Sequence, residues 1–342
     1  MRVSEIGEFG LIELLAKELG LSYPPAPGAQ RRDGLIVDIG DDAVVSRSRD
    51  GGLIWTTDTL VAGVHFLPGR TAWRDTGWKA LAVNVSDVAA MGGRPDLALV
   101  TLALPDDFAV EDALELYRGL GAAARRYGVS LGGGDVVRSP VFSITVALSG
   151  WAATSDRGEP LVMTRDAARL GDVVAVSGEL GDSAGGLQLL AAGDAFATAA
   201  AQRLRAAHER PEPPLDLGGR AVAAGVRCAI DVSDGLVQDL GHVGRASGVG
   251  IRIEAARLPL SAALQERLPG QAAGLALSGG EDYQLVLIGR RPAIESLLAD
   301  AETMLTEIGE VVHYEPPRVA VVDENGREVP LGRAGWDHLA GG

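Results

Sequence analysis

Lysine and cysteine are nearly absent from this 342-residue sequence. Its only two lysines are Lys17 and Lys79, and neither follows a glycine, which excludes the Gly-Lys phosphate loop of many nucleotide-binding proteins. Its single cysteine, Cys228, excludes an intramolecular disulfide and a multi-cysteine zinc site. The apolar run around Cys228 predicts a buried strand residue rather than a nucleophile. The composition therefore fits a reducing compartment.

Basic residues are outnumbered by acidic ones, 31 to 46, and long apolar runs are scarce. A net charge of -15 argues against a broad basic surface that would hold nucleic acid. No segment approaches a membrane-spanning length, and the first eight residues lack the cationic start and apolar core of a signal peptide. We therefore expect a cytoplasmic protein with neither nucleic acid nor membrane as a partner.

Strand and helix patterns alternate along a chain long enough for two domains. Helices are predicted over 8–19, 73–91 and 110–127, and strands over 53–58, 97–104 and 141–151, from their apolar spacing. This alternation predicts an α/β (α+β) fold. We place one domain at residues 1–153 and a second at residues 154–342.

Carboxylates recur where apolar strands meet glycines. Residues 228–231 read as a strand and residues 236–240 as the start of a helix, with Asp231 and Asp234 at the junction. Such a pair alone could simply cap the helix. Similar settings, among small or apolar residues, hold Asp41, Asp42, Asp58, Asp87, Asp135, Glu281 and Asp282.

Aspartates among glycines and valines have few cations nearby, so bringing several together is strongly repulsive unless a positive group is bound. Oxygen ligands suit magnesium, which commonly shares its coordination with substrate phosphates. The sequence therefore predicts a site for phosphoryl transfer that contains several metal ions.

Other residues allow two interpretations each. The glycines of Gly132–Asp135 permit close approach of the backbone to phosphate, or form a flexible turn. The predicted loop 59–66 places His65 toward a ligand, or His65 is structural. Arg165 is a phosphate clamp or a surface charge. Trp336 fills a core or stacks on a flat ligand.

In combination, these motifs resemble the thiamine-monophosphate kinase family over nearly the full length and in the same order. The segments that carry the resemblance are 7–9 (GEF), 40–43 (GDDA), 57–66 (TDTLVAGVHF), 79–87 (KALAVNVSD), 133–135 (GGD), 231–235 (DVSDG) and 278–283 (SGGEDY). The resemblance implies the two-domain fold of the aminoimidazole-ribonucleotide-synthetase-like superfamily, with mixed sheets packed with helices. It also implies a homodimer formed through the N-terminal domain, and binding of ATP without a Walker loop.

The resemblance further implies a role for each matching residue. Ligands of several Mg²⁺ ions would be Asp42, Thr56, Thr57, Asp58, Asp87, Asp135, Asp231 and Asp234. Contacts with ATP would come from Tyr117, Gly134, Asp135, Arg165 and Ser233. Thiamine monophosphate would meet His65, Glu281 and Trp336. Serine often stands in the family where this chain has Thr56, and both residues offer a hydroxyl.

The implied reaction is direct in-line transfer from ATP to thiamine monophosphate, which gives thiamine diphosphate in the last step of its biosynthesis. The attacking phosphate is already anionic, since its second pKa is about 6, so no strong general base is needed. Positioning and charge neutralisation then dominate catalysis. We therefore assign no residue as a separate catalytic acid or base.

Competing interpretations are sister activities of the superfamily and a non-catalytic acidic protein that binds calcium or nucleotide. The sisters are purine-pathway synthetases, selenophosphate synthetase and a hydrogenase-maturation protein. Selenophosphate synthetase would carry a reactive cysteine or selenocysteine near the N-terminus, and the maturation protein a C-terminal cysteine. This chain has neither.

Overall fold

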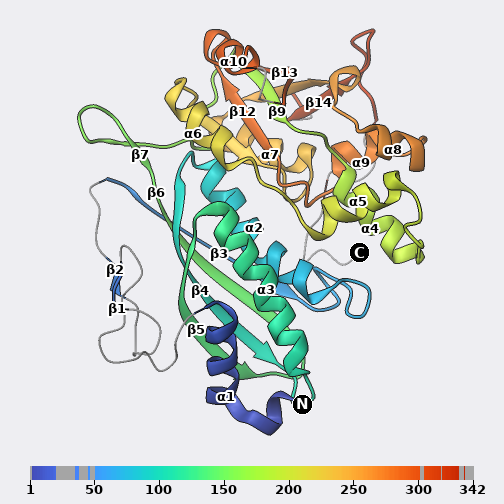
Figure 1. The fold of residues 1–342 in the computed structure, drawn as a ribbon. Coiled ribbons are helices and arrows are strands. Elements are labelled where there is room, and N and C mark those ends of the chain that lie inside the picture. The colour runs from blue at the N-terminus through green and yellow to red at the C-terminus, as the bar shows by residue number, and fades with distance from the viewer. Residues whose placement is uncertain are drawn as a thin grey trace. The chain divides into compact units, whose positions relative to one another are not determined.

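The computed structural model describes residues 2–20, 35–37, 45–46, 51–300, 304–316, 318–330 and 335 (Figure 1). The chain forms two compact units: unit 1 comprises Met1–Val85 and Pro95–Glu159, and unit 2 comprises Ser86–Arg94 and Pro160–Gly342. The last part of helix α2 (Trp73–Ala90) therefore belongs to unit 2. No helix in the described part of the chain is long and apolar enough to cross a membrane.

Unit 1 contains a four-stranded sheet in the order β3 (Leu53–Val61), β6 (Ser143–Trp151), β4 (Arg94–Leu104) and β5 (Ser130–Arg138). Strand β3 runs antiparallel to β6, and β4 runs parallel to β5. Helices α1 (Val3–Glu18) and α3 (Val110–Tyr127) contact β5 and each other. Shorter strands are β1 (Leu35–Val37), β2 (Val45–Ser46) and β7 (Ala153–Thr154).

Side chains of β3 and β6 alternate between a buried and an exposed face of this sheet, as the two-residue period of a strand requires. Ile144, Val146 and Leu148 of β6 are fully buried. Thr56 lies opposite Leu148 and Asp58 opposite Val146, so both of these β3 residues are on the buried side. Thr57 lies on the exposed side with Trp55, which is 62% exposed.

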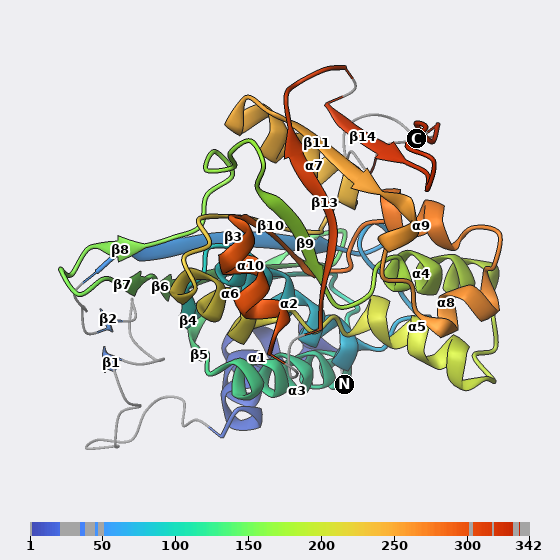
Figure 2. The same ribbon diagram turned by 90° about the horizontal axis from the view of Figure 1, so that it is seen from above.

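Unit 2 contains a six-stranded sheet, three strands of which lie side by side in Figure 2 (β9, β13 and β11). All neighbours are antiparallel except β11 and β14, which are parallel. The strand order is β10 (Cys228–Asp231), β12 (Leu285–Gly289), β9 (Val173–Ser177), β13 (Leu305–Val312), β11 (Gly250–Glu254) and β14 (Val319–Val322). The remaining elements are β8 (Pro160–Leu161), α4 (Asp182–Ala192), α5 (Ala199–Glu209), α6 (Leu215–Ala223), α7 (Leu236–Ser247), η1 (Ala255–Arg257), α8 (Ala262–Arg267), α9 (Ala272–Ser278) and α10 (Arg291–Leu298).

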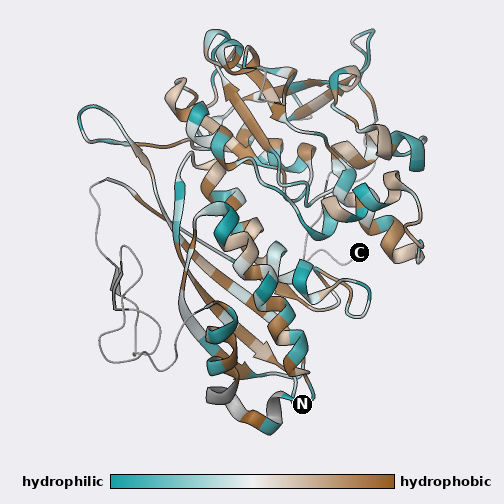
Figure 3. Ribbon diagram, in the orientation of Figure 1, coloured by the Kyte–Doolittle hydropathy of each residue, from teal (hydrophilic) through white to brown (hydrophobic). Residues whose placement is uncertain are grey.

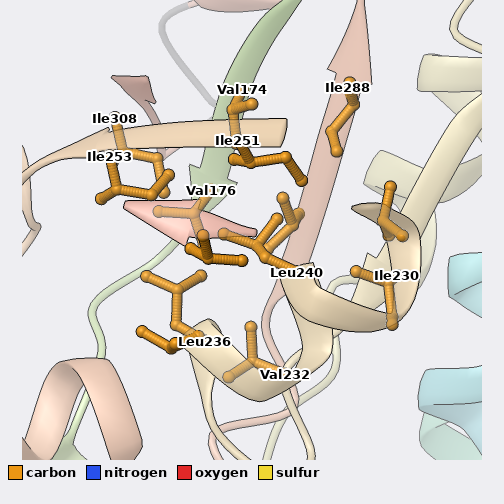
Figure 4. Close-up of a cluster of buried hydrophobic side chains, with 14 of the residues drawn as sticks. Val174, Val176, Ile230, Val232, Leu236, Leu240, Ile251, Ile253, Ile288 and Ile308 are labelled. Atoms are coloured by element: carbon orange, nitrogen blue, oxygen red, sulfur yellow. The ribbon is translucent and has the colours of Figure 1, made fainter. Parts of the chain in front are cut away.

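Strands β10, β12 and β9 are buried on both faces of the unit 2 sheet, because alternate residues of each strand enter different cores. Ile230 of β10 packs with Leu236 and Leu240 of α7 (Figure 4), whereas its neighbour Ala229 packs with residues of α6 and α10. Strand β12 is accordingly hydrophobic along its whole length (Figure 3). Strand β10 ends at Asp231, a buried carboxylate next to these apolar residues.

The flexible turn, one of our two interpretations of the glycines in Gly132–Asp135, is wrong, because these residues are part of strand β5. The parallel register with β4 shifts between Ala98 and Leu99, which leaves Gly132 as an extra residue in a bulge. Gly134 lies opposite Val100, and a Cβ there would come within 1.7 Å of the Val100 carbonyl oxygen. Glycine is therefore required for strand pairing at this position. The expected loop 59–66 is also partly wrong, since β3 continues to Val61.

We expect Gly134→Ala to destabilise unit 1 by about 3 kcal/mol or more, because backbone atoms cannot move aside for the methyl group. Gly133→Ala is the matched control: its backbone φ of +142° is also unfavourable, but no atom lies within 4 Å of the added Cβ. Its cost should be about 1–2 kcal/mol. Urea denaturation followed by tryptophan fluorescence measures both changes, and equal costs would contradict the steric explanation.

Candidate functional site

Asp231 is a buried carboxylate at the end of β10, only 4% exposed. Burial raises its pKa, and the charge of Asp87 raises it further. The Ser86 hydroxyl donates a hydrogen bond to Asp231 Oδ2 at 2.8 Å, and Arg165 lowers the pKa through its charge. The two acids repel each other in a setting that solvates charge poorly, so a bound cation would stabilise this arrangement.

The loop that follows Asp231 is fixed by one carboxylate oxygen. Asp239 Oδ2, in the first turn of α7, accepts hydrogen bonds from the backbone N–H groups of Ser233, Asp234 and Gly235, each at 3.1 Å. Burial raises the pKa of Asp239 to about 7, with further contributions from Asp231 and Asp234. Asp239 therefore holds the polar loop in one shape.

Asp234, Asp239 and His242 form a group whose ligand atoms all lie within 4.8 Å of one another. Burial lowers the pKa of His242, as do the charges of Arg245 and Arg165, which favours the neutral imidazole that metals bind. Oxygen donors dominate this group and the neighbouring Asp231, which is the donor set that magnesium prefers. The residues present in unit 2 therefore fit a magnesium site.

Glu281 lies beside the same loop. Its backbone N–H donates to the Ser233 carbonyl at 2.7 Å, and that of Tyr283 donates to the Val232 carbonyl at 2.9 Å. Both residues have left-handed backbones, with φ of 66° and 49°. Between them, Asp282 accepts hydrogen bonds from backbone groups at the start of α4. The two acidic stretches recognised in the sequence, 231–234 and 279–282, are thus adjacent.

Asp282 provides a pH-dependent stability term. Its burial raises its pKa to about 7, although the N–H groups of Gly181 and Ser183, at 2.7 and 3.1 Å, lower it. Between pH about 4 and 7 the folded protein therefore holds a proton that the unfolded chain releases, so stability falls as pH rises through this window and then levels off.

We expect Asp282→Asn to remove this dependence. From pH 5 to pH 8, wild type should lose about 2 kcal/mol more free energy of unfolding than the variant. Urea denaturation followed by far-UV circular dichroism at the two pH values measures the difference. Asp216→Asn, at an exposed position of α6, should keep the wild-type dependence. Equal pH dependence of all three proteins would show that Asp282 does not titrate as described.

Unit 1 carries the other candidate residues on different elements. Thr56 and Asp58 lie on the buried side of β3, and Thr57 on its exposed side. Asp135 is exposed on β5, opposite the exposed Thr101 of β4. Consecutive strand residues point to opposite faces, so side chains of Thr57 and Asp58 are directed apart.

His65 and Tyr117 have clear structural surroundings. His65 Nδ1 accepts a hydrogen bond from the Val61 N–H at 3.0 Å, so the neutral ring carries its proton on Nε2. Lys79 Nζ donates to the His65 carbonyl at 3.4 Å. Next to this loop, Phe66 packs edge-on against Trp73. Tyr117 lies on α3, and burial raises the pKa of its phenol, which therefore stays protonated at neutral pH.

The structure thus gathers the candidates of unit 2, namely Asp87, Arg165, Asp231, Ser233, Asp234 and Glu281. Asp42 and Trp336 lie outside the described residues.

Three residues of this region were not predicted from the sequence, namely Ser86, Asp239 and His242. The signal for Ser86 was the Val-Ser-Asp triplet that occurs in both halves of the chain. Asp239 gave no such signal, because an acidic residue in the first turn of a helix is common and stabilises the helix through its dipole.

The two halves of the chain match two models of one class of protein. Residues 40–152 match the N-terminal domain of AIR synthase related proteins, and residues 169–322 match the C-terminal domain. The fold and the acidic site therefore define an AIR synthase related protein with both domains. This agrees with the fold class expected from the sequence.

Similarity to individual proteins identifies the family within this class. Thiamine-monophosphate kinase of Escherichia coli (strain K12) is 40% identical over 310 residues, which are 88% of this chain and 91% of that protein. A crystal structure of thiamine-monophosphate kinase from Stenotrophomonas maltophilia K279a has a TM-score of 0.79 and 37% identity, covering 95% of this chain and 98% of the other. A structure described as AaThiL complexed with AMPPCP and TMP has a TM-score of 0.75 and 36% identity, covering 99% of each chain. The chain belongs to the thiamine-monophosphate kinase family.

Proposed function

We propose that this chain transfers the γ-phosphoryl group of ATP to thiamine monophosphate and releases thiamine diphosphate and ADP, the last step of thiamine diphosphate biosynthesis. Family membership supports this function, as does similarity along the whole chain to a protein described as complexed with AMPPCP and TMP. The observation that carries the proposal within this chain is Asp231, a buried acid whose pKa is raised by the charge of Asp87 and which precedes the loop holding Ser233.

We propose magnesium as the cofactor, bound as several ions. In unit 2 the ligands would be Asp87, Asp231 and Asp234. Asp87 and Asp231 repel each other, and the charges of Asp231 and Asp234 both raise the pKa of Asp239, so a cation would offset this concentration of negative charge. Asp42, Thr56, Thr57, Asp58 and Asp135 complete the proposed set. When bound, magnesium would supply positive charge that lets the negatively charged triphosphate of ATP and phosphate of thiamine monophosphate approach each other.

Residues of the chain would orient the two substrates. The charge of Arg165 lowers the pKa of both Asp231 and His242. Arg165 and the backbone near Ser233 would together bind a phosphate group of ATP. Tyr117, Gly134 and Asp135 are the further proposed contacts with ATP. Glu281 would face the cationic thiazolium ring, and His65 and Trp336 are the other proposed contacts with thiamine monophosphate. With the acceptor phosphate already anionic, the residues position it for in-line attack and need not remove a proton.

A homodimer through unit 1 belongs to the same proposal. The exposed side of its sheet carries large apolar side chains, among them Leu53 at 48% and Trp55 at 62% exposure, with Leu99 and Val137 on β4 and β5. Exposed apolar surface of this kind is typical of contacts between protein chains. We place the enzyme in the cytoplasm, where ATP is available as the phosphoryl donor.

The test is a product assay with purified protein, ATP, Mg²⁺ and thiamine monophosphate. We expect thiamine diphosphate and ADP in equal amounts, and no turnover with aminoimidazole precursors as alternative substrates. A chiral γ-phosphoryl group should arrive with inverted configuration, as a single in-line transfer requires. ATP binding without turnover on thiamine monophosphate would contradict the proposal, and a trapped phosphorylated enzyme would contradict direct transfer.

A further inference from the structure

A buried histidine contacts the carboxylate of Glu281. His208, in the last turn of α5, is 2% exposed, and its Nδ1 lies 3.4 Å from Glu281 Oε2. The same Nδ1 lies 3.2 Å from the Ser183 hydroxyl oxygen on α4. An ionised carboxylate can only accept, so Nδ1 must carry a proton for this contact to be attractive. Ser183 then accepts from the same N–H group.

The backbone of Glu281 is held in place by its neighbours. Its N–H donates to Ser233, and Asp282 is anchored to the N–H groups of Gly181 and Ser183. A left-handed conformation at a glutamate is uncommon and costs about 1–3 kcal/mol, so it persists only where surrounding contacts impose it. Here those contacts direct the Glu281 side chain toward His208.

His208 is also held, through the packing of α4 against α5. A Cβ at Gly186 of α4 would lie 2.1 Å from the Leu204 carbonyl oxygen and 3.1 Å from His208 Cβ. Glycine at this position lets the two helices approach closely enough for Ser183 to reach His208. The ring is therefore held at Nδ1 by contacts with both Ser183 of α4 and Glu281.

We infer that His208, fixed by Ser183, is a positioning residue that aims the Glu281 carboxylate at the ring cation of the acceptor substrate. The inference rests on the proposed function and extends it to substrate recognition. One carboxylate oxygen is held by the imidazole, and the group keeps its negative charge for a cationic ring. The site thereby selects a phosphate ester that bears a cationic ring over one with a neutral ring of the same shape.

The test compares His208→Leu with His208→Asn in steady-state assays. Asparagine places an N–H donor close to the position of Nδ1, whereas leucine removes it. We expect the leucine variant to raise KM for thiamine monophosphate about 10-fold or more, to leave KM for ATP within about 2-fold, and the asparagine variant to recover most of the loss. Ser183→Ala should cause a smaller change of the same kind. A merely structural role would change both KM values together, or lower kcat alone.

Two further measurements make the test specific. In a Glu281→Gln background, His208→Leu should have little additional effect, since the two residues act as one unit. The ratio of kcat/KM for thiamine monophosphate to that for a neutral thiophene-ring analogue should fall about 10-fold in His208→Leu. Independent, multiplicative effects of the two substitutions, or an unchanged ratio, would overturn the inference. Wild type that forms no thiamine diphosphate would instead refute the proposed function.

Discussion

Asp231→Asn should lower kcat/KM for phosphoryl transfer by about 10³-fold, equivalent to about 4 kcal/mol of transition-state stabilisation. Asparagine has the same shape and its amide oxygen can still accept from Ser86, so the backbone should not move. What is lost is a buried negative charge that, with Asp87, is proposed to hold a cation. Steady-state assays at saturating Mg²⁺ measure the effect.

The same variant should be at least as stable as wild type when metal is chelated. Burial and repulsion by Asp87 both act against the charged form of Asp231, so the neutral asparagine removes an unfavourable term. Thermal unfolding in EDTA tests this. Ser86→Ala is the control for the hydrogen bond and should lose about 10-fold in activity. A variant that is both inactive and strongly destabilised would indicate a structural role for Asp231 instead.

Removing Mg²⁺ should abolish turnover and also lower the stability of the wild-type protein. A cation that binds only the folded state at 100 times its dissociation constant stabilises by about 2.7 kcal/mol, which corresponds to a rise in Tm of about 5–10 °C for a domain of this size. Differential scanning calorimetry with Mg²⁺ and with EDTA measures the rise. In Asp231→Asn the rise should be less than half as large.

Replacing Mg²⁺ by Ca²⁺ distinguishes a metal that takes part in catalysis from one that only stabilises the structure. Ca²⁺ also takes oxygen ligands, but with looser geometry and longer distances. We expect Ca²⁺ to raise Tm while supporting less than about 1% of the turnover seen with Mg²⁺. Thiamine diphosphate formed at the wild-type rate in EDTA would contradict the proposed role of the cation.

Periodic patterns made the helices and strands of this chain predictable. Helix 110–127 was predicted with the bounds of α3, and strand 97–104 lies within β4, because their apolar residues follow one period without interruption. Glycine allows both a turn and a strand, so the sequence alone could not exclude the flexible turn at 132–134 that the structure contradicts. Only the pairing with Val100, which is remote in sequence, decides between them.

The acidic residues of the candidate site could be predicted from the sequence, but the residues that hold them in position could not. Asp231 and Glu281 stand out as carboxylates in apolar or glycine-rich surroundings, and the fold brings their two segments together. Asp239 and His208 look like ordinary helix residues in the sequence. Their roles depend on distances to Ser233 and Glu281 that no local pattern contains.

The most direct test of the central claim is a count of bound metal ions. Mn²⁺, followed by electron paramagnetic resonance, can replace Mg²⁺ in a titration of protein loaded with a non-hydrolysable ATP analogue. We predict several ions for wild type and at least one fewer for Asp231→Asn. The same number bound with the same affinity in both proteins would contradict the claim that this buried acid serves to hold the metal.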